Sequence, residues 1–210
     1  SESNDCLIRR LVEIWNSRIR LAFLVGAVRD LIEYGPCKPE NEQGLDKIKE
    51  EYENSQILKG PFYSADPTGK RNGNGVSPEL KETTEKLCKD VEATINQANS
   101  SKAITSQEQL DEKIDLLRGV VTMCYPMGLP PFDSVDLALK DDWKTTLAGT
   151  NSIQGVLCED KAGLWMAGKE FIRSKKVCDR IGKNEKTKII CKLQRPDSGP
   201  PCREPAVSEK

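Results

Sequence analysis

Apolar side chains recur three and four residues apart through several long stretches of this 210-residue chain. That spacing places them on one face of an α-helix, so it predicts a fold built mainly from amphipathic helices. The first such stretch covers residues 6–34. We expect Asn4 or Asp5 to cap its start, Asn16-Ser17 to divide it into two helices, and Gly35-Pro36 to end it.

Two further helices are predicted to form an antiparallel hairpin. Ser77-Pro78 starts the first, which runs to about Asn99, because Ser caps a helix and Pro fits its first position. A capping box in Thr105-Ser106-Gln107-Glu108 starts the second. The side chains predicted to face inward are Leu80, Thr84, Leu87, Cys88, Val91 and Ile95 in the first helix, and Leu110, Ile114, Leu117 and Val121 in the second.

The rest of the chain alternates between irregular segments and further helical patterns. Pro36–Ser77 is dense in Gly, Pro and Asn, which predicts turns and a solvated loop around a short helix at about 45–53. Val135–Asp142 predicts one or two helical turns. Thr150–Ile181 carries the longest helical pattern, and Gly182 is well placed to end it.

These patterns together predict a mainly α fold. A small multi-helix domain is expected over residues 1–182, with a long irregular connection at about 36–77. A basic, Pro-rich extended arm and tail is expected over residues 183–210. Within that arm, Lys186–Leu193 fits either a short strand with no obvious partner or an extended segment.

Eight cysteines and no histidine limit the chemistry available to the chain. Without His, the Ser-His-Asp and Cys-His nucleophiles and His metal ligands are excluded. No two cysteines lie closer than eleven positions, so the close pairs typical of zinc sites are absent. Cys88, Cys124 and Cys158 lie in apolar helical stretches, which predicts reduced, buried thiols. We therefore expect no metal, no cofactor and no enzymatic activity.

Neither a membrane nor nucleic acid is an expected partner. The longest apolar stretch, Leu21–Val28, is far shorter than the roughly 20 residues of a membrane-spanning helix. It continues an amphipathic helix and lacks a cleavage site, so secretion is not predicted. The 32 Lys and Arg residues balance 33 Asp and Glu residues, giving a formal net charge of −1. That balance argues against nucleic acid as the obligate partner of the whole chain.

Residues 169–195 form a strongly basic segment, called the basic strip below, with ten basic and three acidic residues. It is either a docking surface for an acidic partner or a solvated helix end whose cations favour the negative pole of the helix dipole. The second interpretation does not explain the cations beyond Gly182, so protein docking is favoured. RNA is disfavoured because no aromatic residue follows Phe171. The residues predicted to bind the partner are Lys169, Arg173, Lys175, Lys176, Arg180, Lys183, Lys186, Lys188 and Lys192.

A Pro-rich run interrupts the helices at Tyr125-Pro126-Met127-Gly128-Leu129-Pro130-Pro131. Its prolines favour extended backbone and remove hydrogen-bond donors. Such a run is either a preformed recognition segment or a buried corner between two helices. The corner is favoured, with Tyr125, Met127 and Leu129 packing inward.

Several stretches, taken in order, resemble the signature segments of one family. They are Leu117–Val121 with Tyr125–Asp133, a tryptophan-bearing segment at Leu164–Glu170, a basic motif at Gly182–Ile190 and the exit Arg203-Glu204-Pro205, with weaker echoes at Gln43-Gly44-Leu45 and Arg71-Asn72-Gly73. Together they resemble the Kurly family of cilia- and flagella-associated proteins. In that family the tryptophan-bearing segment is expected to be helical.

The resemblance implies a non-enzymatic protein of the cytoplasm and the cilium or flagellum, including the basal body and axoneme. It implies a role in the pre-assembly or placement of axonemal dynein arms. The implied partners are dynein assembly factors, axonemal dynein subunits and tubulin. The alternative is a stable structural component of the axoneme bound to microtubule doublets, because tubulin's acidic surface would suit the same basic strip.

Overall fold

The computed structural model describes residues 2–44, 59–100, 105–140, 142–147, 150–184, 186, 189–195, 198–199 and 201. The contacts divide the chain into two compact units. The terminal unit comprises residues 1–16 and 155–210, and the central unit comprises residues 17–154. The predicted division after residue 182 falls inside the terminal unit and stays a prediction.

The first helix, α1 (Asn4–Tyr34), is continuous, so the predicted division at Asn16-Ser17 is wrong. Asn16 is buried and its side-chain amide exchanges hydrogen bonds of 2.8 and 2.9 Å with the backbone of Leu157. The Ser17 hydroxyl accepts a hydrogen bond from the Gln107 side chain. Both polar side chains therefore bond to distant groups instead of competing for their own helix backbone.

The ends of α1 follow local rules, with one correction at the start. Ser3, rather than Asn4 or Asp5, caps the helix, because its hydroxyl accepts from the Cys6 N–H at 3.2 Å. Asn4 instead lies buried and donates to the Ile172 carbonyl. Gly35 ends the helix as predicted, with a φ of +76° that a side chain would disfavour.

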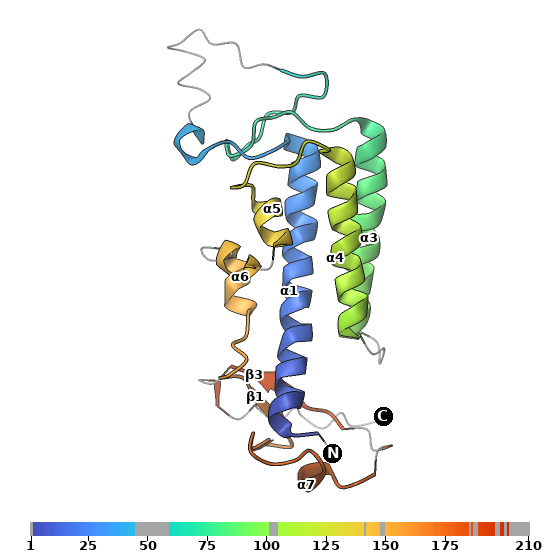
Figure 1. The fold of residues 1–210 in the computed structure, drawn as a ribbon, viewed down its shortest axis with the longest axis vertical. Coiled ribbons are helices and arrows are strands. Elements are labelled where there is room, and N and C mark those ends of the chain that lie inside the picture. Colours follow the sequence, from blue (N-terminus) through green and yellow to red (C-terminus); the bar gives the residue numbers. More distant parts are fainter. Residues whose placement is uncertain are drawn as a thin grey trace, which may run out of the picture. The chain divides into compact units, whose positions relative to one another are not determined.

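The predicted helical hairpin of the central unit is confirmed as α3 (Pro78–Ser100) and α4 (Gln107–Cys124), which lie side by side beside α1 (Figure 1). All four predicted residues of the second helix are buried. The capping box is displaced by one residue from its predicted place: Ser106 and Gln109 form it. Ser106 has extended backbone angles and is the residue directly before the first helical residue, so Gln109 occupies the third helical position.

The described parts of the connection, residues 36–44 and 59–77, are irregular as predicted, apart from η1 (Glu40–Glu42). They are not simply a solvated loop. Isolated bridges join Cys37 to Arg71 and Tyr63 to Asn74, and the Arg71 side chain is buried. The predicted helix at about 45–53 lies outside the described residues.

Three short helices lie in the chain between the Pro-rich run and the strands. They are α5 (Ser134–Leu139), α6 (Trp143–Thr146) and η2 (Asn151–Gly155). The first confirms the turns predicted near Val135. Val135, Ala138, Trp143 and Leu147 are buried. Among the described helices, none is both long and apolar enough to cross a bilayer.

The predicted helix over 150–181 is wrong, because this region contains a β-hairpin. Strands β1 (Gly163–Met166) and β2 (Lys169–Glu170) are antiparallel, with Met166 opposite Lys169. The two residues between them, Ala167 and Gly168, have φ of +49° and +74°. Two consecutive positive φ values form the tight turn that matches the twist of a hairpin and that a helix cannot contain.

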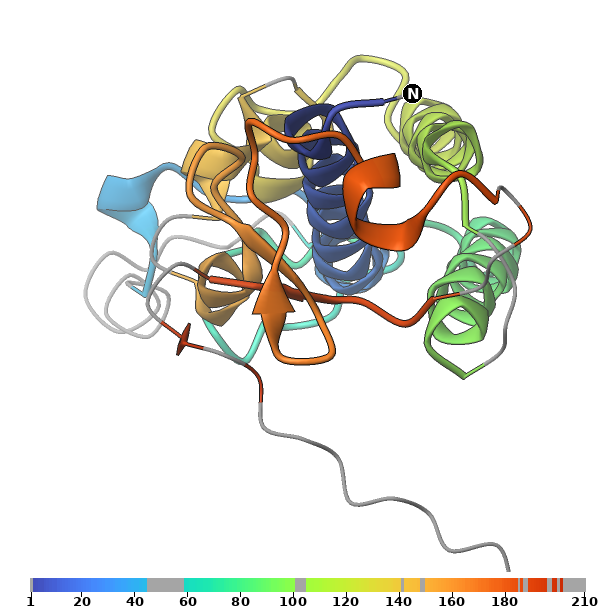
Figure 2. The ribbon, with the colours of Figure 1, turned by 90° about the horizontal axis from the view of Figure 1, so that it is seen from below.

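The terminal unit pairs β1 with a third strand, β3 (Lys192–Gln194), in the order β2-β1-β3, and adds the short helix α7 (Cys178–Ile181). Leu164 lies opposite Leu193, so β3 has a sheet partner that the sequence did not suggest. The strands and α7 surround the first turns of α1 (Figure 2). The core of this unit consists of Ile8, Val12, Leu157, Ala162, Leu164 and Phe171.

Candidate protein-binding surface

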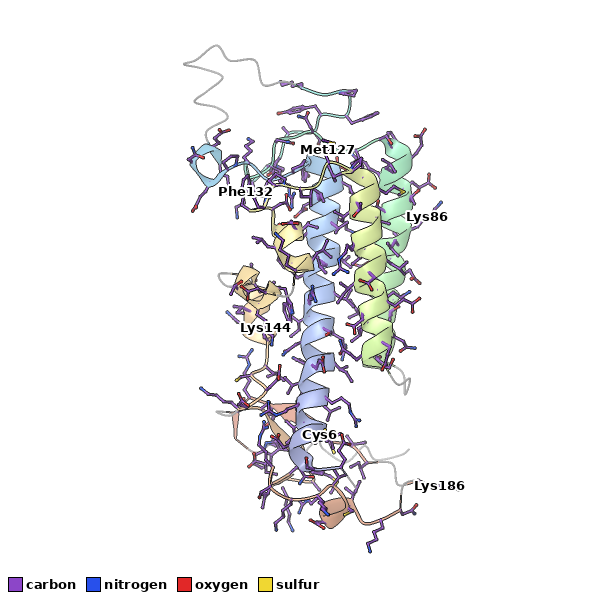
Figure 3. All side chains as sticks on the ribbon, in the orientation of Figure 1. Cys6, Lys86, Met127, Phe132, Lys144 and Lys186 are labelled. Atoms are coloured by element: carbon purple, nitrogen blue, oxygen red, sulfur yellow. The ribbon has the colours of Figure 1, made fainter. Side chains whose placement is uncertain are left out.

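The basic strip presents its lysines to solvent. Lys169 belongs to β2, Lys175 and Lys176 precede α7, and Lys183 and Lys186 follow it. All five are exposed, and none of them forms an ion pair with another described residue. Figure 3 shows Lys186 projecting from its segment. Five cations without ion-pair partners among the described residues give this stretch a positive potential, the kind of surface that suits acidic groups.

Arg173 belongs to the same predicted set but has internal partners. Its guanidinium bonds the Asp5 carboxylate and the carbonyls of Glu159 and Ala162. The hydrogen bonds from Arg9 and Arg173 hold the pKa of the Asp5 carboxyl below its usual value. Arg173 therefore joins the hairpin segment to the start of α1 within the terminal unit.

The remaining predicted residues of the strip differ in environment. Arg180 is half-buried, and its Nε is buried without a hydrogen-bond partner among the described residues. Lys192 is half-buried on β3, opposite Trp165. Lys188 lies outside the described residues. Apolar side chains accompany the cations: Ile172 and Ile190 are 54% and 87% exposed.

The Pro-rich run forms a turn and then a corner in the central unit. The Gly128 N–H donates to the Tyr125 carbonyl at 2.9 Å, which closes a turn, and Gly128 has a φ of +84°. Met127 lies at the tip of this turn and is 99% exposed, so the predicted inward packing of Met127 is wrong (Figure 3). Tyr125 does point inward, and its hydroxyl donates to the Leu31 carbonyl of α1.

The corner is held by a buried ion pair that the sequence analysis missed. Asp133 is fully buried, caps α5 through the Val135 N–H, and accepts from the Cys37 N–H at 2.8 Å. Its Oδ2 also accepts from the guanidinium of Arg71, which donates in addition to the Gly35 carbonyl. The sequence shows Asp133 as a capping residue directly before α5. Its partner Arg71 lies 62 positions away, and no local sequence pattern indicates the pairing.

The described cysteines are poorly suited to thiol chemistry. Burial raises the pKa of Cys37, Cys88, Cys124 and Cys191, which keeps these thiols protonated and poorly nucleophilic at neutral pH. The seven described cysteines are free thiols, although Cys158 is exposed and lies outside any helix, contrary to expectation. Within the described ranges, no three or more Cys, Asp or Glu side chains gather as metal ligands do.

Comparison with known proteins identifies the family. A family model described as cilia- and flagella-associated protein 298 matches residues 162–210. The protein of that name from Danio rerio is 35% identical over 98% of this chain and 73% of its own length. Those from Homo sapiens and Drosophila melanogaster are 34% and 31% identical, over 95% and 99% of this chain and 71% and 74% of their own lengths. No solved structure matches. The chain therefore belongs to the cilia- and flagella-associated protein 298 family, which is the Kurly family that its motifs resemble.

Proposed function

We propose that this protein is a non-enzymatic binding factor that assists the pre-assembly or placement of axonemal dynein arms. It would act in the cytoplasm and at the basal body before or during assembly of the axoneme. The family name supports a cilium-related role. The partners proposed for it are dynein assembly factors and axonemal dynein subunits, whose acidic segments would meet the basic strip.

The observation that carries the proposal is the set of five exposed lysines that lack ion-pair partners among the described residues. They lie within residues 162–210, the segment that the family model matches. Surface lysines of a structural domain are usually mixed with acids, because mixed charge keeps the protein soluble without creating a field of one sign. With ten basic and three acidic residues, the basic strip instead carries a net positive charge, which steers association with an acidic partner. That association weakens at high salt.

A charge-reversal experiment tests this surface. The variant Lys183→Glu/Lys186→Glu should lose crosslinks to dynein chains and to their assembly factors in motile-ciliated cells. Its melting temperature should stay close to that of the wild type, because both side chains are exposed and make no ion pair with a described residue. The control Lys86→Glu/Lys144→Glu makes the same charge change at exposed positions of α3 and α6 and should keep the crosslinks (Figure 3). Equal crosslinking by both variants would exclude the strip as the docking surface.

Fractionation of the same cells separates this proposal from the structural alternative. A soluble protein linked to dynein chains supports an assembly role. A protein retained in axonemes after salt and detergent extraction, and linked to tubulin, would instead identify a resident component that uses the basic strip on microtubule doublets. A role in assembly would then be rejected.

A further inference from the structure

The outer face of α4 carries a second row of apolar side chains. Its inner face, with Leu110, Ile114, Leu117 and Val121, is buried in the central unit. On the other side, Leu116 and Met123 are 43% and 50% exposed, with Val120 between them. The spacing 116, 120, 123 places these three on one stripe of the helix surface. A surface helix in a closed core needs only one apolar stripe, so the exposed parts of this second stripe are available to a partner.

A shallow hollow of about 720 Å³ lies along this stripe. We call it the α4 groove; it is lined by Glu108, Asp111, Glu112, Asp115, Leu116, Gly119 and Val120. Gly119 is one of these lining residues and lies in the middle of α4, where an added Cβ would meet no atom within 4 Å. A glycine inside a helix costs about 1 kcal/mol relative to alanine. At this position the missing side chain leaves the α4 backbone open to close approach by another helix.

The groove is also acidic. Of its four carboxylates, Asp115 pairs with Arg118. Glu108, Asp111 and Glu112 make no ion pair with any described residue, and Lys113 points instead to Asp90 of α3. Acids in the first turn of a helix are stabilised by its dipole, which accounts for Glu108. The dipole effect fades after that turn, so it does not account for Glu112, which lies near the exposed Leu116 in the same lining.

We propose that the α4 groove binds a basic amphipathic helix of a partner protein. Apolar residues of that helix would cover Leu116 and Val120, its backbone would approach Gly119, and its Lys or Arg side chains would meet the carboxylates. Among the described residues, the basic strip of a second copy does not supply such a helix. That strip is carried by a two-residue strand, irregular segments and the four-residue α7. The groove is separate from the basic strip, so the proposal does not depend on the proposed function.

The test uses the full chain and a fluorescent peptide of about 18 residues, five helical turns, with Leu on one face and Lys on the other. A scrambled peptide of the same composition has no apolar face. Anisotropy should show that the amphipathic peptide binds about tenfold more tightly than the scrambled one. Gly119→Gln should weaken that binding about tenfold by filling the groove. The matched control Ala93→Gln, on the exposed face of α3, should leave binding unchanged.

A melting measurement and two further variants separate a loss of binding from a loss of folding. Gly119→Gln should melt no lower than wild type, since the position has space for a side chain and Gln is the better helix former. Should it unfold, exposed Leu116→Gln serves in its place. Glu108→Gln/Glu112→Gln should weaken binding and reduce its salt dependence. Equal binding of the scrambled peptide, or unchanged affinity of Gly119→Gln, would overturn the proposal. So would a wild-type dimer in sedimentation that Gly119→Gln abolishes, because the occupant would then be a second copy.

Discussion

The guanidinium Nη1 of Arg71 lies 3.3 Å from the carboxylate Oδ2 of Asp133, and the two side chains are 7% and 0% exposed. This pair ties together α1, the segment 35–37 and the start of α5 in the central unit. Arg71 bonds the carbonyls of Ala27 and Gly35, while Asp133 bonds the N–H groups of Cys37 and Val135. Because both charges are buried and also hydrogen-bonded, removing either one leaves the other without compensation.

Asp133→Ala is therefore expected to lower the free energy of unfolding by about 3–5 kcal/mol. The loss combines an unpaired Arg71 with a missing cap on α5. Urea denaturation of the full chain measures it. The control Asp160→Ala removes an ion-pair partner of Arg9; the Asp160 side chain is 73% exposed, so this change should cost less than about 1 kcal/mol. A similar small cost for Asp133→Ala would show that the buried pair does not hold the corner.

The turn of the β-hairpin makes a second prediction. Gly168→Ala should destabilise the protein by about 1–2 kcal/mol, the cost of placing a Cβ at positive φ, since nothing lies within 4 Å to add a steric clash. Ala167→Asn should instead stabilise it, because Asn-Gly is the preferred pair for this turn. Thermal melts of both variants compare the two effects. If Gly168→Ala raised the melting temperature and Ala167→Asn lowered it, the segment would not form this turn.

Asp66 gives the unfolding free energy a dependence on pH. Burial tends to raise the pKa of its carboxyl, but hydrogen bonds from Thr68 and from the Arg71 and Lys70 N–H groups outweigh it and hold the pKa below the ordinary 3.8. A depressed pKa adds stability above the ordinary value, and that stability is lost as pH falls through the folded value. Urea midpoints should fall as pH decreases below about 4. Asp66→Asn should show a smaller fall; an identical pH profile would contradict this role.

Thiol labelling provides a fourth prediction. Burial raises the pKa of the Cys88 thiol to about 11, so little thiolate exists at pH 8 in the folded protein. Iodoacetamide should then modify Cys88 far more slowly than the exposed Cys158. Peptide mass spectrometry after a time course gives both rates. Labelling in urea should remove the difference, whereas equal rates without denaturant would show that Cys88 is accessible.

The elements that the sequence predicted well are those whose signals are local. The α3–α4 hairpin has a proline at the first helical position, a capping box and one apolar stripe in each helix, all within a few residues of one another. The helix predicted over residues 150–181 was wrong because the spacing of the apolar residues there fits both a helix and a strand. Leu164 and Phe171 are spaced for a helix, yet both face the core from a hairpin. The short Ala167-Gly168 turn was the signal that could have decided between them.

For the candidate surfaces the division is similar. The basic strip is a property of composition, so its charge was visible at once, although the internal bonds of Arg173 were not. The α4 groove could not be predicted from the sequence, because it does not depend on composition. Its residues are ordinary in sequence, and only the packing of the inner face shows that Leu116 and Gly119 lie on the uncovered side.

The sequence by itself determined the family, the mainly helical fold, the hairpin of α3 and α4, and the basic character of residues 169–195, because motifs, periodicity, caps and charge act over short distances. Only the tertiary structure decided that residues 163–170 form a β-hairpin packed with Ile8 and Val12, and that Arg71 neutralises Asp133. Those outcomes depend on burial against residues distant in the chain. The free energy of such contacts exceeds the small local preference for helix, and no local pattern encodes it.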